Sequence, residues 1–334
     1  MMSGKKRKRI IFFLMMFGLL LQGCQTPSST VDPSTTRSSL TEVQAENATQ
    51  LKPTAQQKEP LRTYGIIYPM VNSTYEVITQ NAEETAKDHN IKLLVQAPDE
   101  ANLEQQIRIM ETMIKQKLDG IAIDPVDAKA LIPVINKAVA SGIPVVCFES
   151  DSPGSDRLSF IGADNFETGI TMGKAVSRLL KGRGMILVEA GMSQMYGLSQ
   201  RLDGLLHYLK TETTIDVLEV RFNEGSETRA TVELEEMIDA HPHFNAFIGL
   251  DFVSGSTSIL IWKAKGLKRY ALTLGMTPTT KEALRNGQIT SVISQNEDHW
   301  GESIINILLQ ANSGKKVPEF VDSGIEEIGS EYGK

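Results

Sequence analysis

Apolar and polar residues follow two alternating patterns along most of this chain, and residues 119–149 show both of them. The short apolar run 121–123 is typical of a strand that is buried on both faces of a parallel sheet. Asp127 then stands where a helix N-cap belongs, apolar residues recur behind it at helical spacing, and Gly142 ends the predicted helix. The apolar, β-branched run 143–148 predicts a second strand.

This strand–helix–strand unit predicts both a sheet type and a place for a binding site. Two parallel strands joined by a helix need a right-handed crossover, so the unit belongs in an open α/β sheet. Ligands of such sheets bind beyond the carboxyl ends of the strands. The two strands end at Asp124–Pro125 and at Glu149–Ser150, which are therefore the first candidates for a ligand site.

Predicted strands and helices keep alternating from about Leu61 to a helix over 299–310, and the series starts afresh after a strand at 158–163. Such alternation predicts an α/β protein with two doubly wound, Rossmann-like lobes. The length of 334 residues, 41% of them hydrophobic, is enough for two domains with separate cores.

Charge and cysteine content narrow the class of protein. The formal net charge of -7 argues against a nucleic-acid partner, because phosphate binding needs a basic surface. Cys147 lies inside an apolar strand and is interpreted as a small buried hydrophobic residue. The two cysteines do not predict a disulfide framework.

The first residues have the pattern of a bacterial targeting signal. A basic segment, Lys5–Arg9, precedes an apolar run, Ile10–Leu21, that is shorter than the roughly 20 residues of a membrane-spanning helix. Leu21-Gln22-Gly23-Cys24 resembles the lipobox of bacterial lipoproteins, which implies removal of residues 1–23 and lipidation of Cys24. The alternative is an uncleaved membrane anchor with an incidental cysteine. Both interpretations put the rest of the chain outside the cytoplasmic membrane.

Residues 24–60 are rich in Ser, Thr, Pro and Gln and poor in aromatic residues. Such a segment buries too little apolar surface to offset its chain entropy. We therefore predict a disordered tether that holds the folded part away from the membrane.

From about Thr63 onward the chain resembles the type I periplasmic sugar-binding proteins of the ribose, galactose and xylose group. The segments that carry the resemblance are IIYPMVNSTY, LVQAP, IDPVDAKALIPVINKAVASGIPVV, SFIGADNFETG, MIDAHP and SVISQNEDHWGESI. The resemblance implies two hinged lobes with the ligand in the cleft between them. The chain would cross between lobes near Asp164, Gln295 and Glu326. The implied lobes are 61–163 plus 296–325 and 164–295 plus 326–334.

Several site positions of the family can be matched in the N-terminal lobe. The family carries aromatic residues after its first strand, where Tyr75 matches, Glu76 does not, and Asn72 is a nearby donor. After the fourth strand the ribose binders carry Asp-Arg, and this chain carries Glu149-Ser150. Tyr75 either contacts ligand or caps the core, and Glu149 either contacts ligand or caps the following helix.

The C-terminal lobe departs further from the family pattern. The family's clamping Arg falls at Ser199, with Arg201 two positions on, and the Asn-Asp pair becomes Leu250-Asp251. A family Asp has no counterpart in the shortened turn that contains Met276, whereas Gln295 at the hinge matches. Arg201 either reaches the cleft or forms an ion pair within its helix, and Asp251 either contacts ligand or caps a helix. The family cleft is therefore expected without its usual ribose chemistry.

Apolar residues near the strand ends of the C-terminal lobe, Met192, Met195, Tyr196 and Met276, either form an adaptable wall of the cleft or pack in the core. No histidine stands in a metal-ligand spacing, no GxSxG turn occurs, and no glycine-rich phosphate loop follows a strand. We therefore predict neither catalysis nor a cofactor nor a metal.

The predicted function is capture of a small polar, sugar-like ligand. One class is the substrate-binding component of an ABC importer, held beside its permease by the lipid anchor. The other is a sensor that presents its ligand-bound form to a membrane histidine kinase. The same core occurs in LacI-type repressors, but a signal and tether stand here in place of the DNA-binding headpiece.

Overall fold

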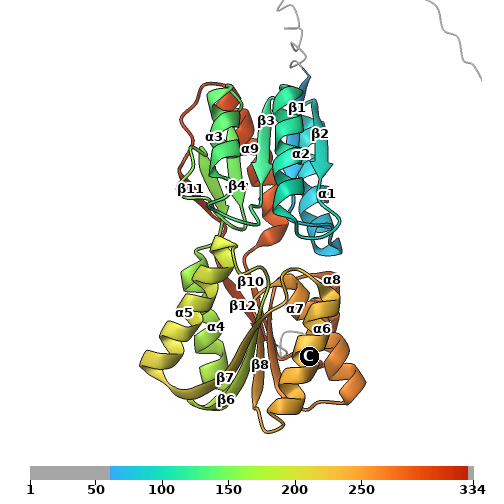
Figure 1. The fold of residues 1–334 in the computed structure, drawn as a ribbon, viewed down its shortest axis with the longest axis vertical. Coiled ribbons are helices and arrows are strands. Elements are labelled where there is room, and N and C mark those ends of the chain that lie inside the picture. Colours follow the sequence, from blue (N-terminus) through green and yellow to red (C-terminus); the bar gives the residue numbers. More distant parts are fainter. Residues whose placement is uncertain (1–60, 330–334) are drawn as a thin grey trace, which may run out of the picture. The chain divides into compact units, whose positions relative to one another are not determined.

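The computed structural model describes residues 61–329, which form two six-stranded sheets with helices on both faces of each sheet (Figure 1). The predicted α/β fold with two doubly wound lobes is confirmed. The predicted signal peptide, Cys24 and the tether lie outside the described residues. In the range 61–329, no helix is both long and apolar enough to cross a membrane.

The first sheet is parallel throughout. Its strands, in spatial order, are β11 (Phe320–Asp322), β5 (Ser159–Gly162), β4 (Val145–Phe148), β3 (Gly120–Ile123), β1 (Arg62–Ile67) and β2 (Ile91–Gln96). Helices α1 (Glu76–Asp88) and α9 (Trp300–Asn312) pack together on one face. Helices α2 (Leu103–Lys115) and α3 (Ile132–Ala140) pack together on the other.

The second sheet is parallel except at one edge, where β12 runs antiparallel to β10. Its strands, in spatial order, are β12 (Glu326–Gly329), β10 (Ser291–Ser294), β9 (Tyr270–Leu274), β8 (Ala246–Gly249), β6 (Arg183–Ala190) and β7 (Thr214–Phe222). Its helices are α4 (Asn165–Leu180), α5 (Tyr196–Glu212), α6 (Glu227–Ala240), α7 (Phe252–Lys265) and α8 (Pro278–Arg285). Helices α4 and α5 pack against each other, as do α6 and α7, and α7 and α8.

The chain passes between the two sheets three times, and the three connecting segments are bonded to one another. They follow β5, β10 and β11. Gln295 Nε2 donates to Asn165 Oδ1 at 3.0 Å and to Thr168 Oγ1 at 2.9 Å. Asn296 Nδ2 donates to the Ser323 carbonyl at 2.7 Å. Since each bond joins residues more than twenty positions apart, the crossings form one connected hinge region.

Side-chain caps fix where several helices begin. Asn102, Asp164, Ser226 and Asp251 each accept a hydrogen bond from the backbone N–H three residues on. These bonds satisfy donors that the first helical turn would otherwise leave unpaired. Each capping residue lies after a strand or in the loop that follows it. The Asn, Asp and Ser residues that begin the helices therefore also lie near the carboxyl ends of the strands.

One expectation about local structure is wrong, and two short strands were not predicted. Asp127 does not cap α3: its carboxylate accepts from Lys129 N and Ala130 N in a preceding turn, and α3 begins at Ile132. Pro133 lies in the first turn of α3, where the missing N–H costs no intrahelical bond. The periodicity also does not predict β11 and β12, which are only three and four residues long.

Candidate functional site

Side chains of both sheets meet at the carboxyl ends of their strands. Tyr68 follows β1, Asp124 follows β3 and Glu149 follows β4 in the first sheet. Met192 follows β6 and Asp251 follows β8 in the second. A small cavity of about 10 Å³ lies between these ends, and its lining includes Met70, Asn72, Tyr75, Glu149, Met192, Met195, Leu198, Asp251, Phe252 and Val253. Room for about one water remains in it, so the cavity must widen to admit a sugar-sized molecule.

Aromatic rings from both lobes pack together at this cavity, which Tyr75 and Phe252 line. Tyr75 stacks on Tyr68 with 4.5 Å between ring centroids, and Phe148 meets Tyr68 edge-on at 5.6 Å. Phe252 of the second lobe meets the Tyr75 ring edge-on at 6.2 Å. Gly275, with φ +87°, makes room for Phe252, because a Cβ there would lie 2.2 Å from that ring. Tyr75 therefore has both roles that the sequence left open, packing in the core and lining the cavity.

The backbone of Glu149 turns sharply and is held from three sides. Its φ is +56°, a left-handed conformation that costs a non-glycine residue free energy. Its N–H donates to the Ile161 carbonyl at 3.0 Å, its carbonyl accepts from Asn165 Nδ2 at 3.0 Å, and Ser150 N donates to the Phe148 carbonyl at 2.6 Å. Glu149 lines the cavity and its Oε2 has no protein hydrogen-bond partner. Glu149 therefore does not cap a helix, the alternative that the sequence left open.

Asp124 lies beside Glu149 and forms an acidic pair with it. Asp124 is fully buried, and its carboxyl group interacts with the Glu149 carboxyl group and the Ser150 backbone rather than with a basic side chain. Gln106 of α2 fixes the backbone there, since its Nε2 donates to the Asp124 carbonyl at 2.7 Å and its Oε1 accepts from Val126 N at 3.1 Å. Burial and the neighbouring Glu149 carboxylate raise the pKa of Asp124 well above its usual range. Burial, partly offset by the charge of Arg201, raises the pKa of Glu149 to about 7.

Arg201 lies behind the cavity and is held by groups of the second lobe. Its guanidinium is fully buried and donates to Asn165 Oδ1 through Nε at 3.1 Å and Nη2 at 2.6 Å, while Nη1 donates to the Leu250 carbonyl. Asn165 also accepts from Gln295 and donates to Glu149, so it joins the hinge to the strand end. Arg201 forms no ion pair within its helix and is absent from the cavity lining.

Asp251 caps α7 and also borders the cavity. Its Oδ2 accepts from Val253 N at 3.0 Å, and its Oδ1 accepts from Ser254 N, Ser254 Oγ and Asn223 Nδ2. Burial raises the pKa of Asp251, while these hydrogen bonds act in the opposite direction. Glu189, at the end of β6, is fully buried with no protein partner for either oxygen, and burial together with the Asp251 charge raises its pKa to about 9.

The structure brings together most, but not all, of the residues chosen from the sequence. Asn72, Tyr75, Glu149 and Asp251 line the cavity, as do Met192 and Met195. Ser150 stands beside it, with its Oγ accepting from Gly197 N at 2.9 Å across the two lobes. Arg201 and Gln295 lie in the buried network behind the cavity.

Ser199 and Met276 lie apart from the cavity. Ser199 Oγ donates to the Tyr196 carbonyl at 2.9 Å, within its own helix. Met276 is only partly buried among apolar residues of the second lobe, and its N–H donates to Glu297 Oε1. The residues predicted from the sequence did not include Phe252 and Asn165. Each directly follows a helix-capping Asp, Asp251 and Asp164 respectively, and those caps are the sequence pattern that marks their positions.

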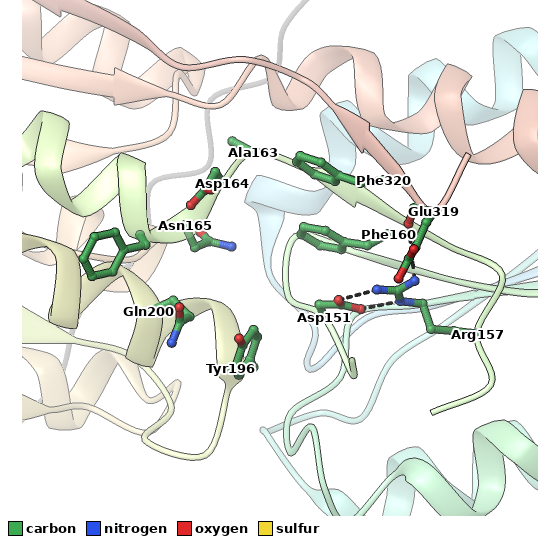
Figure 2. Close-up of a pocket in the computed structure, with 11 residues that line it drawn as sticks. Asp151, Arg157, Phe160, Ala163, Asp164, Asn165, Tyr196, Gln200, Glu319 and Phe320 are labelled. Atoms are coloured by element: carbon green, nitrogen blue, oxygen red, sulfur yellow. Dashed lines mark hydrogen bonds and ion pairs between the residues drawn. The ribbon is translucent and has the colours of Figure 1, made fainter. Parts of the chain in front are cut away.

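A second cavity, of about 330 Å³, lies beside the segment that joins β5 to α4 (Figure 2). Arg157 forms a two-pronged ion pair with Asp151 there, with both N–O distances 2.6 Å. Phe160 and Phe320 stack on each other at 5.4 Å. The charged and aromatic groups of this second cavity are therefore already paired with one another.

The fold and this cavity define a two-lobed binding protein. The model of the periplasmic binding protein domain family matches residues 64–316, and the chain therefore belongs to that family. The resemblance to type I periplasmic sugar-binding proteins is confirmed, as is the prediction that the protein is a binding protein rather than an enzyme. The described part of the chain acts outside the cytoplasm, as periplasmic binding proteins do.

Comparison with individual proteins gives the same family at low sequence identity. A D-ribose/D-allose-binding protein of Pseudomonas aeruginosa is 22% identical over 284 residues, which are 82% of this chain and 88% of that protein. An ABC transporter solute-binding protein of Burkholderia graminis, solved in complex with D-arabinose, has a TM-score of 0.78 at 24% identity and covers 83% of this chain and 97% of its own. GanP, a glucose-galactose binding protein of Geobacillus stearothermophilus, has a TM-score of 0.76 at 22% identity, covering 82% and 99%.

Proposed function

We propose that this protein captures a sugar-like solute between its two lobes and delivers it to an ABC importer. The observation that carries the proposal is the cavity at the carboxyl ends of both sheets, which is lined by the acidic Glu149 and by the aromatic residues Tyr75 and Phe252. A polar group to orient a ligand and apolar surface to cover it are the usual parts of a small-molecule site. The relatives named above are described as sugar-binding or transport proteins, which favours import over signalling to a histidine kinase.

The contacts between the lobes support capture by closure. The proposed lobes are 61–163 plus 296–325 and 164–295 plus 326–334. Gly197 N donates to Ser150 Oγ across them, and Met70 packs with Val253 and Ala230. A ligand that adds contacts to both lobes shifts the population towards the closed state. Hinge closure of this type is known in periplasmic binding proteins as a class.

A ligand screen by thermal unfolding tests the proposal. A true ligand binds only the folded protein, so it raises the melting temperature by mass action. The screen covers monosaccharides, polyols and inositols, including forms that carry an amine. The ligand found should bind at least tenfold more weakly to Phe252→Ala, because the variant loses one wall of the cavity, and normally to Glu84→Gln, which changes an exposed residue of α1. A screen in which no solute raises the melting temperature would overturn the proposal.

We also propose that lipidation of Cys24 anchors the protein beside its permease. Several acyl chains on one cysteine give stable anchoring where a single chain does not. Cys24→Ser is expected to move the protein from the membrane fraction to the soluble extracytoplasmic fraction. Fractionation that is the same for the variant and the wild type would contradict the anchor without affecting the ligand proposal.

A further inference from the structure

Buried carboxyl groups outnumber buried basic groups around the cavity. In the described part of the chain, the buried acidic residues are Asp124, Glu149, Asp151, Glu189, Asp251 and Glu297, whereas Arg201 is the buried basic one. Asp151 has its own partner in Arg157. Charges that are removed from water need a partner of opposite charge or enough hydrogen bonds. Five carboxyl groups therefore remain for one guanidinium.

Most of these carboxyl groups are satisfied within the protein. Asp251 accepts bonds from the first turn of α7, and Glu297 accepts from the backbone of Gln295 and Met276. Glu189 lies outside the cavity lining and retains its proton at neutral pH, since burial raises its pKa to about 9. This leaves the Asp124–Glu149 pair as the acid of the site that has no basic partner in direct contact.

Arg201 does not neutralise that pair by direct contact. All three of its donating nitrogens are engaged by Asn165 Oδ1 and the Leu250 carbonyl. The Glu149 and Asp124 side chains are 4% and 0% exposed, and their carboxyl groups interact with each other and with no basic side chain by direct contact. Glu149 lines the cavity, so it is the member of this pair that a ligand can reach.

We propose that the solute carries a positive charge, as a protonated amine on a polyhydroxylated ring, and that Glu149 is its partner. This inference rests on the proposed function, because it names the class of ligand for the same cavity. A hydroxyl group would supply one hydrogen bond to Glu149 but no charge, whereas an ammonium group supplies both. Tyr75 and Phe252 add aromatic surface to the same cavity, and a cation is attracted to the face of an aromatic ring.

An organic cation fits these residues better than a metal ion does. Within residues 61–329 no group of three or more His, Cys, Asp or Glu side chains is arranged to hold a metal ion. Asp251 already uses both oxygens on α7, so Glu149 and Asp124 would be the sole carboxylate ligands. An ammonium group needs only one or two acceptors, which this pair offers.

Charge pairing makes the expected affinity depend on pH. The titratable groups around Glu149 are Asp124 after β3, Tyr75 before α1, Arg201 on α5, Asp251 before α7 and Glu297 after β10. Burial raises the pKa of Glu149 to about 7, so at acidic pH the free protein holds a proton that the ammonium group must displace. Binding should then become about twentyfold tighter between pH 5.5 and pH 7.5, with release of a proton.

Matched pairs of solutes test this inference. The probes are pentoses, hexoses and inositols, each offered as the neutral compound, as the form with one hydroxyl replaced by an amine, and as the N-acetylated amine. Calorimetry at pH 7.5 should give one amine form at least tenfold tighter binding than its neutral and acetylated counterparts. Glu149→Gln should remove that preference, and Glu84→Gln should retain it.

The outcomes separate this inference from the proposed function. Tighter binding of a neutral sugar than of its amine form, with no dependence on pH, would overturn the positive charge and leave solute capture standing. An amine preference that persists in Glu149→Gln would remove Glu149 from its role. If no probe of any form binds, the proposed function and this inference fall together.

Discussion

Replacement of Glu189 by glutamine should make the protein more stable, by an amount that grows with pH. Glu189 is fully buried at the end of β6, and neither of its oxygens has a protein hydrogen-bond partner. Burial and the nearby Asp251 charge raise its pKa from 4.5 to about 9. The folded protein therefore keeps a proton that the unfolded chain loses, and stability falls as the pH rises from about 4.5 to about 9. Glutamine has nearly the same shape and does not ionise.

The size of the effect follows from the two pKa values. Each unit of difference between the folded and unfolded pKa is worth about 1.4 kcal/mol once the unfolded group is ionised. At pH 5 the cost of Glu189 is below about 1 kcal/mol, and at pH 8 it is roughly 5 kcal/mol. The stability gained by Glu189→Gln should thus increase by about 4 kcal/mol between these two pH values.

Urea unfolding of the ligand-free protein, followed by circular dichroism at pH 5, 6.5, 8 and 9, measures this difference. Glu84→Gln is the control, since it makes the same chemical change on the exposed side of α1. The free energy of unfolding of the control should run parallel to the wild type at every pH. Parallel curves for Glu189→Gln as well would show that Glu189 is ionised in the folded protein, and the reasoning from burial would be refuted.

Two further substitutions test the contacts between the lobes. Gly197→Ala would put a Cβ 2.9 Å from Asn165 Nδ2 and 3.2 Å from the Glu149 carbonyl. It should therefore weaken ligand binding at least tenfold, with little change in the melting temperature of the free protein. Unchanged affinity in calorimetry would show that the lobes close without the close contact between Gly197 and Glu149. Asn165→Ala leaves the buried Arg201 guanidinium without its main acceptor. The substitution should therefore lower the free energy of unfolding by about 3 kcal/mol. A loss below about 1 kcal/mol in urea unfolding would contradict the role of Asn165 as a connector.

Much of the fold could be predicted because burial imposes a pattern on the sequence. Strands that are covered on both faces need continuous apolar runs, and β3 and β4 show them clearly. The edge strands β11 and β12 do not have continuous apolar runs, because they are short and partly exposed. Asp127 shows a second limit: an Asp before an apolar helix caps either the helix or a preceding turn, and here Pro133 moves the helix start downstream.

The candidate site was predictable where strand ends determine it and not where packing does. Glu149 follows directly from the end of β4, and Asp251 from the end of β8. Phe252 reaches the cavity because Gly275, at the end of another strand, leaves room for its ring. A contact between residues this far apart in the sequence cannot be predicted from a local sequence pattern. Arg201 was a candidate ligand residue from the sequence, but its hydrogen bonds go to Asn165 and a backbone carbonyl behind the cavity.

Glu149 and Glu189 differ in how their charge can be neutralised. Because of this difference, Glu149 can take part in ligand binding, whereas Glu189 affects only stability. Both are buried, unpartnered carboxyl groups at strand ends with raised pKa values. Glu189 is absent from the cavity lining, so a proton rather than a ligand neutralises its charge, and its effect is confined to the stability of the free protein. Glu149 lines the cavity, so a cationic ligand can take the place of the proton. The increase in melting temperature caused by such a ligand should therefore grow between pH 5.5 and pH 7.5 in the wild type and in Glu189→Gln, but not in Glu149→Gln.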